Sequence, residues 1–368
     1  MGRGRDEVAG LRVVPSGSSV VMPPLDFERP LQLMQLAWKH GKSHFPCHTG
    51  RDRSLKGGTP VHAESFTAMV VADLLLDLPV DPQQRMLVRE IQTMLERELG
   101  EEEDVFYFFK EHERLPADAD CTAVGLSVLL RGGVSGQRIR ERANRALDLI
   151  LSNVSAEGVV ETYFDPTGER TGIVDPVVCC NVLYLAFALG RGDEAQATLE
   201  YVKQVLEEEG YLEGTRYYHS PDTFLYFLGR VVHFFPKETE ELLREQLEAA
   251  VKRRLGCSGH TLDVAQRAIL CAWLEMEDGG ELDRLRAMQE GDGFWPTDAL
   301  FRYGRKKVFF GSRVMTAAFV MGALAAKQAS AERRAAAGED DAEEKEWDPW
   351  AEEEWSYQRR GPSFLSFR

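Results

Sequence analysis

The sequence predicts an all-α protein built from helical hairpins in a single large domain. Two observations carry this prediction. From about residue 31 to residue 327, nearly every segment has apolar side chains at helical spacing and is rich in Leu, Ala, Glu and Arg. In the same region, one kind of helix start recurs six times with a period of roughly 50 residues, which is typical of repeat folds. A chain of 368 residues, 43% of them hydrophobic, can bury the core that such a fold needs.

Each predicted repeat begins with a polar or proline-containing turn, which leads into a helix of small and apolar residues. Such turns begin near six residues: His62, Asp118, Asp175, His219, Thr261 and Gly311. Helices that are apolar on all sides belong in the interior of a protein. We therefore expect these six helices to form an inner ring.

More polar helices are predicted between these starts. They cover residues 82–99, 134–154, 195–209, 237–255 and 281–289. Their charged faces suit an outer ring in contact with water. Six inner helices with outer partners close into an (α/α)6 toroid, and an open solenoid of the same repeats is the alternative.

The repeat phase also predicts where polar side chains gather. If the inner helices start at one rim, their first turns converge on one central cavity. The residues expected at its mouth are His62, Glu64, Asp118, Asp120, Asp175, His219, Asp222, Asp263 and Arg313. Aromatic clusters at residues 105–109, 162–164, 216–218 and 293–303 either plug the toroid or line its pocket. For any single ring, plugging is the simpler interpretation.

Composition divides the chain into three regions. Residues 1–27 are predicted to be a flexible leader, residues 28–328 the toroid domain, and residues 329–368 a disordered acidic tail. Residues 339–354 hold ten acids against one lysine, interspersed with tryptophans, so a docking peptide for a protein partner is the alternative for the tail.

Charge and targeting signals restrict the class of protein. The net charge of −16 argues against a nucleic-acid partner. The amino terminus lacks the apolar core of a signal peptide, and no uninterrupted run of 18 apolar residues occurs, so we expect a cytoplasmic protein. The six cysteines show no disulfide-framework spacing, and reduced thiols are expected.

Two short stretches resemble motifs of a known superfamily. Asp118-Ala-Asp-Cys-Thr-Ala123 resembles the Asp-x-Asp-Asp-Thr-Ala motif of class II terpene cyclases and squalene-hopene cyclases, and its second half resembles the Asp-Cys-Thr-Ala-Glu motif of oxidosqualene cyclases. Gln289-Glu-Gly-Asp-Gly-Phe-Trp295 is similar to the Gln-x-x-x-Gly-x-Trp repeat of the same superfamily, which ties neighbouring helices together. The chain departs from the acid motifs at Cys121 and Val124, and it has room for one toroid where squalene-type cyclases have two.

The resemblance implies that Asp120 is the general acid of a protonation-initiated cyclase. Protonating an alkene or an epoxide requires a neutral acid, whereas a free Asp with a pKa of about 3.9 is ionised at neutral pH. Burial and the neighbouring Asp118 would favour the protonated form, and Cys121 could donate a weak hydrogen bond to it. The carbocation that follows would be stabilised by aromatic rings. The predicted substrate-binding residues are Phe66, Tyr163, Asp175, Asn181, Tyr184, Tyr218, His219, Phe224 and Trp295.

The leading interpretation is thus a terpene cyclase-like isomerase or lyase acting on a linear isoprenoid. One alternative is a glycan hydrolase or lyase of six helical hairpins, with Asp120 and either Asp175 or Asp263 flanking a glycosidic bond. The other is a binding scaffold without catalytic activity. No metal-ligand set is assigned, and Mg²⁺ is expected only if the substrate carries a diphosphate. Peripheral membrane contact is a further open alternative, because apolar substrates such as isoprenoids partition into membranes.

Overall fold

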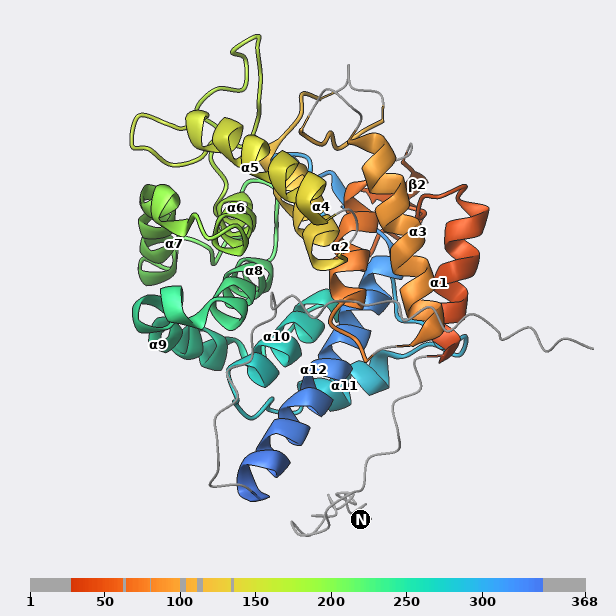
Figure 1. Ribbon diagram of the computed structural model, residues 1–368. Helices are drawn as coiled ribbons and strands as arrows, with labels where there is room; N and C mark the ends of the chain where they lie inside the picture. Colours follow the sequence, from red (N-terminus) through yellow and green to blue (C-terminus); the bar gives the residue numbers. More distant parts are fainter. Residues whose placement is uncertain are drawn as a thin grey trace, which may run out of the picture.

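The computed structural model describes residues 28–61, 64–79, 81–99, 104–110, 115–133 and 136–339. Within these ranges, twelve helices form two concentric rings (Figure 1). The inner ring consists of α2 (Phe66–Leu75), α4 (Ala119–Arg131), α6 (Pro176–Ala188), α8 (Pro221–Phe234), α10 (Thr261–Trp273) and α12 (Arg313–Glu339). Each inner helix packs against the next one, and α12 packs against α2. The ring is therefore closed, which confirms the predicted toroid and excludes the open solenoid.

The outer ring contains the more polar helices. Its members are α1 (Glu28–His40), α3 (Pro82–Glu98), α5 (Gly136–Ser152), α7 (Gln196–Glu207), α9 (Pro236–Arg254) and α11 (Glu281–Met288), with a short 3₁₀ turn, η1 (Gly192–Ala195), before α7. Five of the six match the predicted outer helices to within a few residues. The sixth, α1, buries Leu31, Met34 and Trp38 at helical spacing and packs on α3 and α12.

The inner helices begin where polar side chains satisfy their free backbone N–H groups. Asp118 Oδ1 accepts a hydrogen bond from Cys121 N at 2.7 Å at the start of α4, and Asp175 Oδ1 accepts one from Val177 N at 2.9 Å at the start of α6. Ser220 has the same role for α8. At these three helices, the polar turns recognised in the sequence are therefore helix caps.

The centre of the toroid is tightly packed. All residues of α4 from Ala119 to Leu129 are buried. A Cβ atom added at Gly125 would lie 2.9 Å from the ring of Phe106 and 3.1 Å from Met69. Because the rings and helices approach this closely, the inner helices need small residues at their contacts.

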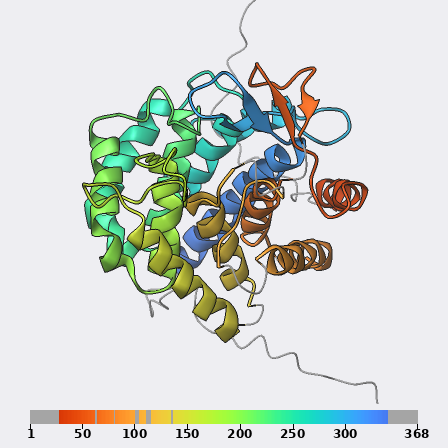
Figure 2. The same ribbon diagram turned by 90° about the horizontal axis from the view of Figure 1, so that it is seen from above.

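A small antiparallel sheet lies at the rim where the inner helices begin (Figure 2). Its strands are β1 (His48–Gly50), β2 (Thr59–Pro60), β3 (Ala299–Arg302) and β4 (Phe309–Gly311), in the order β2-β1-β4-β3. The pairing of β1 with β4 joins two segments that are distant in the sequence and that lead into α2 and α12. The sequence did not predict this sheet, because strands of two to four residues show no clear alternation.

The last helix continues past the predicted end of the domain. Residues 329–339 belong to α12, whereas the domain boundary at residue 328 stays a prediction. This segment is rich in Ala, the best helix former, and Gln328 Nε2 donates to Glu332 Oε1 at 2.8 Å one turn along the helix. The leader at residues 1–27 and the tail from residue 340 lie outside the described residues.

α12 is also long and apolar enough to cross a membrane, judged by length and composition. Two-thirds of its most apolar stretch, 67%, is buried inside the toroid, which is typical of a core helix.

Candidate active site

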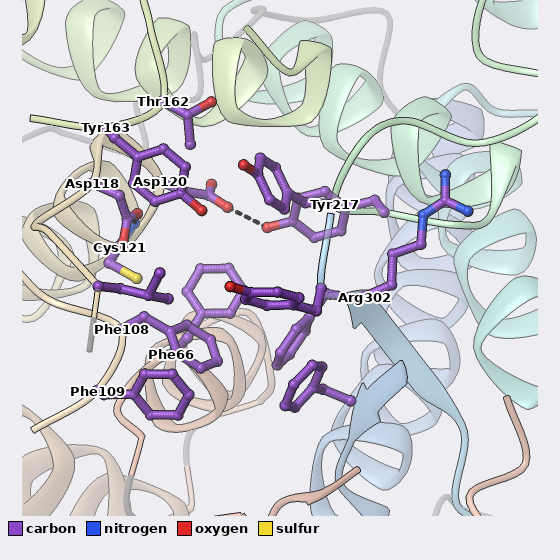
Figure 3. Close-up of a pocket in the computed structure, with 15 residues that line it drawn as sticks. Phe66, Phe108, Phe109, Asp118, Asp120, Cys121, Thr162, Tyr163, Tyr217 and Arg302 are labelled. Atoms are coloured by element: carbon purple, nitrogen blue, oxygen red, sulfur yellow. Dashed lines mark hydrogen bonds between the residues drawn. The ribbon is translucent and has the colours of Figure 1, made fainter. Parts of the chain in front are cut away.

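A pocket opens at the rim where α2 and α4 begin (Figure 3). Its lining is mostly aromatic, and Asp118 and Asp120 are its acidic members. The lining residues are Phe66, Phe108, Phe109, Leu115, Asp118, Asp120, Cys121, Thr162, Tyr163, Tyr217, Tyr218, Phe301, Arg302, Tyr303 and Phe310. The aromatic clusters therefore line the cavity, and the expectation that their rings plug the toroid is wrong for these residues.

The first turn of α4 is fixed by backbone hydrogen bonds on both sides. Asp118 N donates to Phe106 O at 3.3 Å, and Ala119 N donates to Thr162 O at 2.8 Å. Asp118 and Tyr163 also form an isolated antiparallel bridge. The two aromatic segments around residues 106 and 163 thus clamp the turn that presents the carboxyl groups.

Asp120 reaches the pocket but is only 9% exposed. Both of its oxygens accept hydrogen bonds: Tyr218 Oη donates to Oδ2, and Asn181 Nδ2 donates to Oδ1 at 2.7 Å (Figure 3 shows the first of these). Burial raises the pKa of Tyr218, so its phenol stays protonated and remains a donor. Because a carboxyl group has about four lone-pair positions, room remains for a proton on Asp120.

The surroundings of Asp120 favour its neutral form. Burial, and secondly the nearby Asp118 carboxyl, raise the pKa of Asp120 to about 7, against the opposing hydrogen bonds from Tyr218 and Asn181. Burial likewise raises the pKa of Asp118 to about 6. Among the described residues, no Lys, Arg or His forms an ion pair with either carboxyl group. The site therefore holds an acid that is protonated in a substantial fraction of molecules at neutral pH.

Cys121 follows the acid and contributes a thiol to the pocket wall. Burial raises the pKa of Cys121 well above its usual range, so the group stays a thiol and can act only as a weak hydrogen-bond donor.

Two aromatic walls face each other across the pocket. In one, the ring of Phe301 packs edge-on against Phe66 and Phe108, with centroids 5.7 and 5.4 Å away, and stacks on Phe310 at 5.6 Å. In the other, Tyr163 and Tyr217 meet edge to face at 5.9 Å. The first wall draws on α2, the segment around residue 108, β3 and β4, so the unpredicted sheet forms part of the site.

Comparisons of the sequence with known proteins find similarity to terpene cyclases. The family of sesquiterpene cyclase astC-like C-terminal domains matches residues 60–188, which include the acid motif. A drimenol cyclase, drtB from Aspergillus calidoustus, is 32% identical over 213 residues, which amount to 58% of this chain and 38% of that protein. The matched region therefore spans well under half the length of this curated relative.

Solved structures with a similar fold show which architecture this chain has. The type II terpene cyclase MstE from Scytonema has a TM-score of 0.60 at 13% identity, covering 82% of this chain and 99% of that one. The chain has a class II terpene cyclase-like fold. Other structures of MstE contain geranylgeranyl dihydroxybenzoate as substrate and merosterolic acid A as product. An unsaturated glucuronyl hydrolase specific for heparin shares the toroid less closely, with a TM-score of 0.52 at 10% identity, covering 83% of this chain and 96% of that one.

Six of the predicted site residues line the pocket of this cyclase-like toroid: Asp118, Asp120, Cys121, Phe66, Tyr163 and Tyr218. Two others lie next to it. Asn181 binds Asp120 from behind, and Asp175 Oδ2 accepts a hydrogen bond from Tyr217 N at 2.9 Å, which anchors the segment that carries Tyr217 and Tyr218.

Four predicted substrate-binding residues are not among those that line this pocket, and their contact with a substrate stays a prediction. Tyr184 lies eight residues beyond the start of α6, about 12 Å deeper along the helix. Phe224 stacks on Tyr211 at 5.2 Å, and His219 packs against Phe309 at 5.1 Å. Trp295 Nε1 donates to Leu285 O at 2.7 Å and ties α11 to the segment that directly follows it.

Other residues expected at the mouth are tied into ion pairs. Asp222 binds Arg254 and Arg267, and Arg313 binds Glu290 and Asp292. His62 lies outside the described residues.

Several lining residues were not predicted as site residues. They are Phe108, Phe109, Leu115, Thr162, Tyr217, Phe301, Arg302, Tyr303 and Phe310. The aromatic clusters ahead of the inner helices were the signal for most of them, whereas nothing in the sequence pointed to Leu115 or Phe310. Across the described ranges, no group of three or more His, Cys, Asp or Glu side chains is placed to hold a metal ion. Mg²⁺ stays a prediction that depends on the substrate.

Proposed function

We propose that this protein is a class II terpene cyclase in which Asp120 starts the cyclisation of a linear isoprenoid by protonating an alkene or an epoxide. The observation that carries the proposal is the placement of Asp120. It lies at one end of an apolar, aromatic pocket, where burial and Asp118 raise its pKa to about 7. This is the combination that a strong acid needs in order to protonate carbon.

The geometry suggests how the first step proceeds. The proton moves from Asp120 to the less substituted carbon of the terminal alkene, or to the epoxide oxygen as the C–O bond breaks, leaving a tertiary carbocation and an Asp120 carboxylate. Hydrogen bonds to a charged acceptor are stronger than those to a neutral one. Tyr218 and Asn181, which donate to the two oxygens of Asp120, therefore stabilise the carboxylate as it forms.

The aromatic walls would carry the cation through ring closure. Phe66, Phe301 and Tyr163 present π faces or edges within the same pocket, and a ring face attracts a cation by about 0.5–2 kcal/mol. Loss of a proton or addition of water ends the sequence, so the product is an isomer or a hydrate of the substrate.

The comparisons support the class of substrate. The matching family is one of sesquiterpene cyclases, and the curated relative is named for drimenol, so a farnesyl chain is our first candidate. The geranylgeranyl substrate of MstE makes a longer chain the second. If the substrate is a diphosphate, Mg²⁺ is expected to accompany its phosphates.

A cytoplasmic location and a partner for the acidic tail are further predictions.

The test is direct. The full-length protein is incubated with farnesyl diphosphate, geranylgeranyl diphosphate or squalene, with and without Mg²⁺, and products are identified by gas chromatography and mass spectrometry. We expect a cyclic product from the wild type and none from Asp120→Asn. Absence of cyclisation with every substrate would overturn the proposed activity, and an active Asp120→Asn variant would overturn the role of Asp120.

The pH dependence provides a second readout. Only protonated Asp120 can donate, so the rate should fall about tenfold per pH unit above a pH of about 7. A rate that stays constant to about pH 9 would contradict this acid.

The two rival functions fit the site less well. A glycan hydrolase would need Asp175 or Asp263 as a second free carboxylate, but Asp175 caps α6 and accepts from Tyr217 N, and Asp263 is bound by Arg53. The centre of the toroid is filled, as in a scaffold, but the rim keeps a pocket with two acids in an aromatic lining, which a scaffold does not need.

A further inference from the structure

A chain of buried polar side chains crosses the centre of the toroid below Asp120. Asn181 on α6 donates from Nδ2 to Asp120 Oδ1 at 2.7 Å. Arg230 on α8 donates from Nη1 to Asn181 Oδ1 at 3.4 Å and from Nη2 to Asp73 Oδ1, on α2, at 2.8 Å. The chain thus links the acid on α4 to three other inner helices.

Arg230 is held rigidly in this position. Its side chain is only 2% exposed, and its guanidinium carbon lies 3.5 Å from the centre of the Tyr184 ring. Burying an arginine is costly unless the group is well paired. Arg131 Nη1 lies 2.8 Å from Asp73 Oδ1, and Arg131 also pairs with Asp77, so two arginines and two carboxyl groups share this cluster. Of the two arginines, Arg230 also contacts Asn181.

The contact with Asn181 gives Arg230 a different role. The two ends of an Asn amide have nearly the same size, so the group can face Asp120 with either its NH₂ or its oxygen. A guanidinium group has donors only. With Arg230 on one side, the oxygen of Asn181 must face the arginine, and the NH₂ must face Asp120.

We propose that Arg230 is a positioning residue that locks the amide of Asn181 with its NH₂ toward Asp120, so that the proton of Asp120 stays directed at the pocket. This inference rests on the proposed function, in which Asp120 is the acid. If the amide turned over, Asn181 Oδ1 would accept the proton of Asp120 and hold it away from the substrate. The NH₂ group would also no longer stabilise the carboxylate that forms.

The kinetic test compares two buried arginines. Arg230→Met removes the contact with Asn181, and Arg131→Met removes a cation from the same Asp73 without touching Asn181. We expect Arg230→Met to lower kcat about 10- to 100-fold with KM changed by less than about twofold, because the acid is misdirected while the pocket is unaltered. Arg131→Met should keep kcat within about twofold of the wild type. Equal losses of kcat in the two variants would overturn the proposal.

A double-mutant cycle separates positioning from general damage. Without the amide, Arg230 has nothing to orient, so adding Arg230→Met to Asn181→Ala should change kcat by less than about twofold. If Arg230→Met lowers kcat by the same factor in both backgrounds, Arg230 does not act through Asn181.

A spectroscopic readout does not require turnover. The carboxyl ¹³C signal of Asp120 reports its pKa, which in the wild type is set with Asp118, Asp175, Tyr218 and Cys121 close by. Arg230→Met should raise the pKa of Asp120, because the Asn181 hydrogen bond that lowers it is lost, and Arg131→Met should leave it unchanged. If Arg230→Met still raises that pKa in the Asn181→Ala background, the effect is the direct loss of charge and the proposal falls.

The two hypotheses can fail separately. If the wild type cyclises no isoprenoid but the pKa of Asp120 responds to Arg230→Met through Asn181, the proposed function fails and the positioning role stands. If cyclisation occurs and neither kcat nor that pKa depends on Arg230, the positioning role alone fails.

Discussion

Asp120 and Asp263 lie in the first turns of inner helices in two repeats and have opposite electrostatics. Both lie in the first turn of an inner helix, α4 for Asp120 and α10 for Asp263, and they are 9% and 3% exposed. Burial by itself would raise the pKa of each carboxyl group. At Asp120 nothing cationic opposes it, and the pKa rises to about 7. At Asp263 the contact with Arg53, at 2.9 Å, and the hydrogen bond from Ser220 outweigh burial and leave the pKa below its usual value.

The difference shows that the repeat alone does not make an acid. It delivers a carboxyl group to the same rim in each case, and the partner decides whether the group is neutral or charged. Arg53 comes from the loop between β1 and β2, so the small sheet supplies the cation that makes Asp263 structural. Its counterpart beside Asp120 is a pair of neutral donors, Tyr218 and Asn181.

The largest expected effect is on catalysis. Asp120→Asn should lower kcat at least about 1000-fold, since it removes the proton, while Asp263→Asn should lower it less than about tenfold. The measurement is initial rates of product formation at about pH 6.5, near the pH where Asp120 is still protonated. Comparable losses of kcat in the two variants would show that the electrostatic difference between Asp120 and Asp263 does not matter for catalysis.

Removing the Arg53 side chain should leave Asp263 as a buried carboxylate without this cationic partner. Arg53→Met is expected to lower the free energy of unfolding by about 3–5 kcal/mol at pH 8, the usual cost of breaking a buried ion pair. Without Arg53 the pKa of Asp263 would rise, so the loss should shrink as the pH falls and the group is protonated. Urea denaturation at about pH 8 and about pH 5 measures both values, and a loss independent of pH would contradict the explanation.

The stability contribution of Asp120 is expected to depend on pH because of its raised pKa. Its pKa is about 7 in the folded protein and about 3.9 in an unfolded chain, so the folded state is favoured at low pH and loses stability as the pH rises through about 7. Asp120→Asn cannot ionise and should be more stable than the wild type by roughly 2–4 kcal/mol at pH 8, with no gain below a pH of about 4. Thermal unfolding across this pH range would reveal whether the difference follows this course.

The smallest effect is expected for the phenol that faces the acid. Tyr218→Phe removes a hydrogen bond that lowers the pKa of Asp120, so the decline in rate should move to higher pH, while kcat falls about tenfold because the carboxylate is less stabilised. Tyr211→Phe, a buried tyrosine stacked on Phe224, is the matched control and should change neither. A pH profile unchanged in Tyr218→Phe would mean that this bond does not tune the acid.

The sequence by itself determined the ring of helices and the position of the acid. Helical periodicity and repeated polar caps such as Asp118 and Asp175 depend on residues within a few positions of one another, so they can be recognised without a structure. The same local logic placed Asp120 in the first turn of a buried helix.

Only the tertiary structure decided which side chains meet the acid and which do not. Asn181 lies 61 residues from Asp120 and Tyr218 lies 98 away, whereas Tyr184, one turn beyond Asn181 on the same helix, lies away from the pocket. Depth along the inner helices and the closure of the ring set these contacts, and a local sequence pattern does not encode them. The β1–β4 sheet, with Arg53 near Asp263 and Phe301 and Phe310 in the pocket wall, depends on pairing between the two ends of the domain. For this reason an acid could be predicted, but the side chains that bind it and complete its pocket could not.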